Sequence, residues 1–187
     1  EERRETTEEK LKQELINSFI LQDFFEGVKS IPDEFVDLIE IDPPYAIRLM
    51  DVKKHCELQD LQMEGYNEVE LDQYLPFMDQ VLKESYRVLK DTGWLIVWFG
   101  PDPWFDSIHA LIKRNKFIGN KMPGLWVKKT EEKAATAQSM QPSLYLANAY
   151  EMFFYARKGG STIYKQGKQN VFLYSQVPAQ RKIHPTE

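Results

Sequence analysis

The chain has 187 residues, 42% of them apolar and 28% charged, which is enough for one globular domain with a sizeable core. The net charge of −5 hides a split: residues 1–110 carry 11 basic and 25 acidic side chains, whereas residues 111–187 carry 13 and 4. A single cysteine, Cys56, excludes an internal disulfide framework, and no apolar run is long enough to cross a bilayer. These features predict a soluble protein of the reducing cytoplasm whose basic last third faces a polyanion.

The apolar pattern predicts strands and helices in alternation. Residues 1–17 are charge-rich and predict a solvated lead-in helix or linker, followed by a domain at 18–187. Alternating strands and helices indicate an α/β sheet with right-handed crossovers. In chain order we expect a strand at 19–21, a helix at 24–29, strands at 36–41 and 94–99 separated by a helix at 74–89, a helix at 106–113, strands near 125–127 and 150–156, and a polar, basic tail at 157–183.

Three turns follow predicted strands directly, at Asp23, at Asp42 and at residues 100–102. In α/β sheets the ligand site lies at the carboxyl ends of the strands. We therefore expect the chemistry of this protein at these turns.

The second turn reads Asp42-Pro43-Pro44-Tyr45. Each proline ring fixes φ and removes an N–H, so the loop is rigid and offers carbonyl acceptors. The Asp42 carboxylate adds a charged acceptor, and Tyr45 adds a flat face. This set suits the exocyclic amine of a nucleobase, which is a poor nucleophile until acceptors hold its N–H groups, with the flipped base stacked on Tyr45. The alternative is a turn that merely ends the strand.

Five segments, in this order and spacing, resemble the amino-group DNA methyltransferases that use S-adenosylmethionine, in the circularly permuted beta arrangement in which the catalytic half precedes the main cofactor half. The segments are residues 19–26, 33–45, 86–98, 150–159 and 181–187. The resemblance implies a Rossmann-like α/β fold, a mixed sheet with helices on both faces. The family's glycine-rich cofactor loop would follow residue 187. We therefore expect an incomplete fold that binds the cofactor weakly or not at all.

The resemblance also implies roles for individual residues. The catalytic motif would be Asp42, Pro43, Pro44 and Tyr45, in the form typical of adenine N6 methylation, whereas a serine in first position is commoner for cytosine N4. Asp23 would receive the adenine amino group of the cofactor, with Phe24 against its ring, and the turn at 184–186 would begin the contact with its methionine end. The cofactor-binding residues would be Asp23, Phe24, Asp42, His184 and Thr186.

Basic residues gather late in the chain. Residues 113–133 and 157–182 hold 13 of them, with aromatic side chains in between, which is typical of a surface that contacts DNA phosphates. A solvated face is the alternative. By the resemblance, target recognition falls at about 157–182, and we expect double-stranded DNA to be bound there by Lys165, Lys168 and Arg181. Because this region is short, we also consider a homodimer in which a second subunit supplies part of the DNA recognition.

The sequence thus predicts a site-specific DNA adenine-N6 methyltransferase of the cytoplasm, encoded by a bacterium or a phage. Methylation of cytosine N4, of RNA or of another planar amine is an alternative, because similar loops serve all of them. A non-catalytic DNA-binding remnant is a second alternative. His55 and His109 lack the spacing of metal ligands, and we expect no metal.

Overall fold

The computed structural model describes residues 19–46, 69–129, 143, 144, 146 and 148–175. The expected lead-in at 1–17 lies outside these residues. The chain divides into two compact units, residues 1–32 and 33–187, and each is described by itself.

The described part of the first unit is a short helical segment. It consists of α2 (Phe24–Gly27) and the 3₁₀ turn η1 (Val28–Ser30), close to the predicted helix at 24–29. Asp23 caps α2, because its Oδ1 accepts hydrogen bonds from the N–H groups of Phe25 at 2.9 Å and Glu26 at 3.2 Å. An aspartate at this position satisfies two of the free N–H groups at the helix start.

The strand predicted at 19–21 is wrong. Phe19 and Leu21 are each 94% exposed, and no described strand pairs with this segment. A run of three apolar residues forms a strand only where a neighbouring strand supplies the hydrogen-bond ladder.

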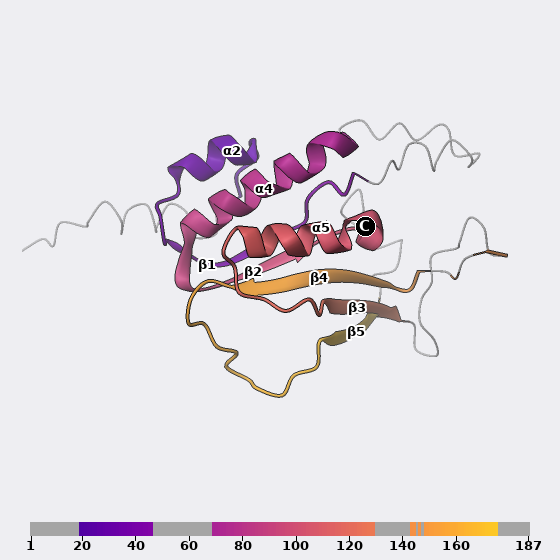
Figure 1. The fold of residues 1–187 in the computed structure, drawn as a ribbon. Coiled ribbons are helices and arrows are strands. Elements are labelled where there is room, and N and C mark those ends of the chain that lie inside the picture. Colours follow the sequence, from indigo (N-terminus) through magenta and orange to yellow (C-terminus); the bar gives the residue numbers. More distant parts are fainter. Residues whose placement is uncertain (1–18, 47–68, 130–142, 145, 147, 176–187) are drawn as a thin grey trace, which may run out of the picture. The chain divides into compact units, whose positions relative to one another are not determined.

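The second unit is built on one five-stranded mixed sheet, which confirms the predicted fold class (Figure 1). Its strands are β1 (Val36–Ile41), β2 (Leu89–Trp98), β3 (Gly124–Lys129), β4 (Tyr150–Arg157) and β5 (Val171–Ser175). They lie in the order β1-β2-β4-β3-β5. β1 runs parallel to β2 and β5 parallel to β3, whereas β4 runs antiparallel to both of its neighbours.

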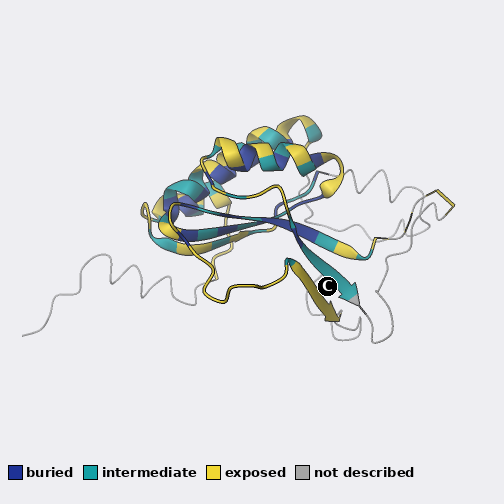
Figure 2. Ribbon diagram, turned by 60° about the horizontal axis from the view of Figure 1, so that its bottom comes forward, coloured by how far each residue is buried: buried dark blue, intermediate teal, exposed yellow. Residues whose placement is uncertain are grey.

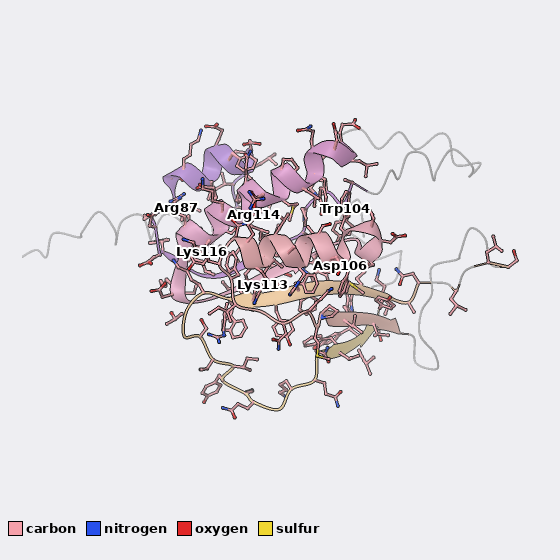
Figure 3. The ribbon with its side chains drawn as sticks, viewed as in Figure 1. Arg87, Trp104, Asp106, Lys113, Arg114 and Lys116 are labelled. Carbon is pink, nitrogen blue, oxygen red and sulfur yellow. The ribbon has the colours of Figure 1, made fainter. Side chains whose placement is uncertain are left out.

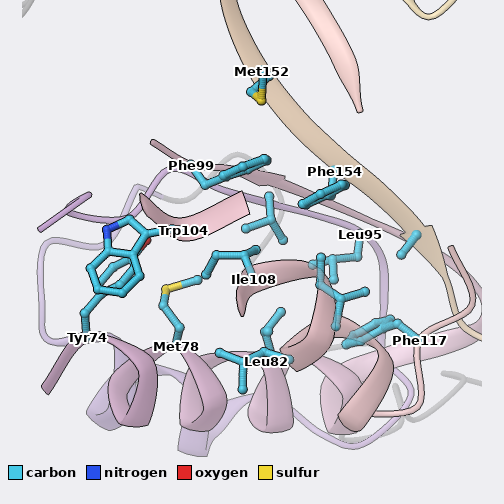
Figure 4. Close-up of a cluster of buried hydrophobic side chains, with 14 of the residues drawn as sticks. Tyr74, Met78, Leu82, Leu95, Phe99, Trp104, Ile108, Phe117, Met152 and Phe154 are labelled. Carbon is cyan, nitrogen blue, oxygen red and sulfur yellow. The ribbon is translucent and has the colours of Figure 1, made fainter. Parts of the chain in front are cut away.

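Two helices, α4 (Leu71–Val88) and α5 (Pro101–Arg114), pack on the same face of this sheet. Their apolar side chains recur every three or four residues, and those of β2 and β4 recur every second residue, so each element presents one apolar face. Figure 4 shows how these faces meet in a single core. The core includes Tyr74, Met78 and Leu82 of α4, Trp104 and Ile108 of α5, Leu95 and Val97 of β2, and Phe154 and Ala156 of β4.

The opposite face of the sheet carries a row of aromatic side chains. The ring centroids of Trp98 and Phe153 lie 4.7 Å apart, those of Trp98 and Trp126 6.2 Å, and those of Phe153 and Phe172 5.9 Å. At the end of this row β5 is exposed along its whole length (Figure 2). The two faces therefore differ: the described helices of this unit cover only one of them, whereas helices on both faces were predicted.

The predicted helices and strands of this unit are present, but several limits shift. The helix predicted at 106–113 lies within the longer α5, which begins at Pro101 and is kinked at Asp102, whose backbone is not helical. Residues 91–93, predicted to end the preceding helix, lie within β2, where the register against β1 shifts. β5 was not predicted, although Val171 to Tyr174 are residue types that favour strands.

Lys158 is one basic residue of 157–182 that turns inward and is only 6% exposed. Its Nζ donates to the carbonyl oxygen of Leu89 at 2.9 Å and to Oε1 of Glu34 at 3.2 Å. The same ammonium lies 4.7 Å from the ring centroid of Tyr86 and 3.6 Å from Oδ1 of Asp91. Lys158 therefore ties the end of β4 to the start of β2 and is not available to DNA.

Replacing Lys158 by methionine should lower the free energy of unfolding by about 2 kcal/mol, because a buried carbonyl loses its donor while the alkyl packing stays. Urea unfolding measures this value. Lys83→Met, at an exposed position of α4, is the control and should change it by less than about 0.5 kcal/mol. Equal losses in the two variants would contradict the structural role of Lys158.

Candidate active site

The residues from Asp42 to Tyr45 form the loop directly after β1. β1 and β2 are parallel, with Ile41 opposite Val97, so the loop lies at the same edge of the sheet as the turn that leads from β2 into α5. Asp42 is exposed, Pro43 is buried, and Tyr45 is half-buried. The loop thus presents one carboxylate to solvent from a backbone that two prolines make rigid.

Tyr45 is held at two points. Its hydroxyl donates a hydrogen bond to Oδ1 of Asp42 at 2.7 Å, and its backbone carbonyl accepts one from Nε1 of Trp104 at 2.8 Å. The first bond fixes the Asp42 carboxylate through Oδ1. The second joins the loop to α5, across 59 residues of sequence.

The electrostatics keep the Tyr45 phenol neutral. Burial, then the hydrogen bond to Asp42, and then the charge of that carboxylate raise the pKa of the Tyr45 hydroxyl far above its usual range. The hydroxyl therefore donates to Asp42 and does not serve as a proton acceptor. A carboxylate fixed beside a flat neutral ring is the arrangement that a nucleobase amine requires.

Two aromatic residues support this loop from the core, and the sequence analysis missed both. Tyr74 is fully buried, and its ring centroid lies 4.7 Å from that of Trp104, which is 8% exposed. The Tyr74 hydroxyl has no hydrogen-bond partner among the described residues, and burial together with the charge of Asp42 raises its pKa. The one sequence signal for Trp104 was its position three residues after Pro101, just past a strand end.

The first predicted strand-end turn, at Asp23, belongs to the other compact unit. Asp23 is exposed, with Oδ1 engaged in the cap of α2, and the neighbouring Phe24 is 40% exposed. An exposed carboxylate followed by an exposed aromatic ring is a set that an adenine ring and its amine would fit. The other predicted contact residues, Arg181, His184 and Thr186, lie outside the described residues.

Lys165 and Lys168 are exposed in the connection between β4 and β5. This connection leaves β4 at Arg157, which pairs with Trp94 at the edge of the sheet opposite Asp42. It ends at Val171, which pairs with Leu125 and is level with the edge that carries Asp42. The connection therefore runs the length of the strands.

Within the described ranges, no group of three or more histidine, cysteine, aspartate or glutamate side chains could hold a metal ion. The same ranges contain no helix that is long and apolar enough to span a membrane.

Because its pKa is raised, the Tyr45 hydroxyl should stay protonated up to the pH at which the protein unfolds. Tyrosinate absorbance during an alkaline titration measures this. The expected result is that Tyr45→Phe titrates the same number of tyrosines before unfolding as the wild-type protein does. One tyrosine fewer in the variant would show that Tyr45 ionises in the folded state.

A family model described as DNA methylase, of the N6 and N4 methyltransferases, matches residues 36–186. No curated protein matches the chain.

Two solved structures have a similar fold. One is the complex of M1.HpyAVI with SAM, at 14% identity and a TM-score of 0.56, with 89% of this chain and 68% of the other covered. The other is the cytosine-N4-specific PvuII DNA methyltransferase, at 16% identity and a TM-score of 0.59, with 86% of this chain and 57% of the other covered. The chain spans about two thirds of the first structure's length and little more than half of the second's. Because the family model matches most of its residues, the chain belongs to the N6/N4 DNA methylase family.

Proposed function

We propose that this protein transfers a methyl group from S-adenosylmethionine to the N6 amine of an adenine flipped out of double-stranded DNA. The observation that carries the proposal is the exposed Asp42 carboxylate, fixed by Tyr45 on a proline-rigid loop at the carboxyl end of β1. Membership of the N6/N4 DNA methylase family supports it. The chain supplies the catalytic segment of the beta arrangement.

The residues of the loop have different roles in activating the target amine and holding the base. The Asp42 carboxylate, with Oδ1 engaged by Tyr45, offers Oδ2 to one N–H of the target amine, and the Pro43 carbonyl is a second acceptor. These bonds draw the nitrogen lone pair out of the ring and make the amine nucleophilic. The Tyr45 ring gives the base a stacking partner, and such stacking contributes about 1–3 kcal/mol per base.

S-adenosylmethionine supplies an electrophilic methyl group on a sulfonium. Among the described residues, Asp23 and Phe24 have the side chains that would bind its adenine: a carboxylate for the amino group and an aromatic ring for the base. In the transfer, the nitrogen–carbon bond forms as the carbon–sulfur bond breaks and sulfur keeps the electron pair. The amine then loses its extra proton to solvent, since the described loop offers acceptors but no group that needs to act as a base.

Asp42→Ala should lower methyl transfer at least about 100-fold, because the acceptor that activates the amine is lost. The assay uses the natural full-length protein that carries this chain, unmethylated double-stranded DNA and tritium-labelled S-adenosylmethionine, with mass analysis of the nucleosides. Asp106→Ala removes an exposed carboxylate from α5 and should leave the rate unchanged.

The expected product is N6-methyladenine. If the product is N4-methylcytosine, adenine is not the target base, but the proposed methyl transfer to a base amine still holds. DNA binding with no methylated nucleoside would overturn methyl transfer and favour a non-catalytic DNA-binding module. An active Asp42→Ala variant would overturn the role of the loop.

We also propose that Lys165 and Lys168 contact DNA phosphates. Both are exposed, and the connection that holds them runs from Arg157, at the edge of the sheet opposite Asp42, to Val171, level with the edge that carries Asp42. Phosphate contacts strengthen binding without reading the target base.

The double change of Lys165 and Lys168 to glutamine should weaken DNA binding and reduce the slope of log K against log salt by about 2, one unit for each lost phosphate contact. Fluorescence anisotropy with a labelled duplex at several salt concentrations measures the slope. Glutamine at Lys29 and Lys83 removes the same charge elsewhere and is the control. An equal slope in both double variants would contradict the proposed contacts.

A further inference from the structure

Trp104 connects the catalytic loop to the helix layer. Its indole N–H donates to the backbone carbonyl of Tyr45 at 2.8 Å, although the residue is otherwise part of the apolar core at 8% exposure. A buried indole N–H needs an acceptor, and this one takes it from the loop after β1. The contact therefore joins the loop to α5.

The carbonyl that Trp104 holds comes just before a strained residue. Ala46 has a φ of +48°, in the left-handed region that residues with a Cβ rarely adopt. Its methyl group is 2% exposed and belongs to the apolar core. The peptide between Tyr45 and Ala46 is thus fixed on one side by the buried methyl and on the other by the indole N–H.

The position of Trp104 is in turn well fixed. It lies just after the kink at Asp102, near the end of α5 that follows β2, whereas Lys113 and Arg114 lie in the last turn of the helix (Figure 3). Its ring packs on Tyr74 of α4, with 4.7 Å between the ring centroids (Figure 4). Two helices therefore hold the donor in place.

We propose that Trp104 is a positioning residue: its indole N–H anchors the Tyr45 carbonyl against the strain at Ala46, and with it the backbone from which the Tyr45 hydroxyl reaches Asp42. The role rests on the proposed methyl transfer, because it acts through the Asp42 carboxylate. Without the indole N–H, the peptide relaxes toward unstrained φ values, and Tyr45 no longer fixes Oδ1 of Asp42.

Trp104→Phe tests this role, because it keeps an aromatic ring against Tyr74 and removes the N–H. We expect kcat for methyl transfer to fall about tenfold, the effect of one lost hydrogen bond, with KM for S-adenosylmethionine changed less than about twofold. Trp126→Phe is the matched control, since the Trp126 N–H is buried with no partner among the described residues. It should leave kcat unchanged.

Adding Ala46→Gly to the Trp104→Phe variant separates positioning from packing. Glycine adopts positive φ without steric cost, so the second change should restore kcat by about threefold. A variant that merely packs poorly would lose further stability from the missing methyl and would not recover. Equal kcat values for Trp104→Phe and Trp126→Phe, or no recovery with glycine, would overturn the proposal.

Amide hydrogen exchange gives a readout that does not depend on activity. The two prolines have no N–H, so Asp42, Tyr45 and Ala46 report on this loop. Their exchange should be about tenfold faster in Trp104→Phe than in Trp126→Phe, at matched global stability. Unchanged exchange overturns the proposal, whereas faster exchange in a protein that transfers no methyl group overturns only the proposed function.

Discussion

The arrangement of the loop from Asp42 to Tyr45 depends on Tyr45, whose side-chain hydroxyl and backbone carbonyl both form hydrogen bonds. Its hydroxyl binds Asp42 within the loop, and its carbonyl binds Trp104 from α5. The carbonyl bond anchors the backbone from which the Tyr45 side chain reaches Asp42, and the next residue, Ala46, has a φ of +48° that residues with a Cβ rarely adopt. The position of the exposed Asp42 carboxylate therefore depends on a core residue, Trp104, through Tyr45.

The sheet topology brings these residues together. β1 and β2 run parallel and end at one edge, so the loop after β1 meets the helix that begins after β2. β4 runs in the opposite direction and carries the chain to the far edge, where Lys158 closes the core. The connection with the exposed Lys165 and Lys168 then returns along the strands to β5, whose first residue is level with the edge that carries Asp42.

Several elements could be predicted from the sequence because their signals are local. The apolar periods of α4 and β2, the continuous strand β1 and the prolines after it are properties of neighbouring residues, and the structure shows each of them. The prediction of strands was wrong where strand formation depends on a partner far away in the sequence. Residues 19–21 lack a neighbouring strand in the described part of the chain, and β5 forms because β3 offers its edge. The pairing partner, and not the residue types alone, decides whether an apolar run becomes a strand.

The sequence by itself indicated the family through the order and spacing of five segments, and it determined the α/β character and the rigid acidic loop at a strand end, because periodicity and proline geometry act over a few residues. Only the tertiary structure decided that Trp104 holds Tyr45 and that Lys158 is structural, since these contacts join residues 59 and 69 positions apart. No local pattern encodes such a contact. The Trp104 contact arises because the parallel strands β1 and β2 deliver two turns to the same edge of the sheet, and the Lys158 contact because the antiparallel β4 ends beside the start of β2.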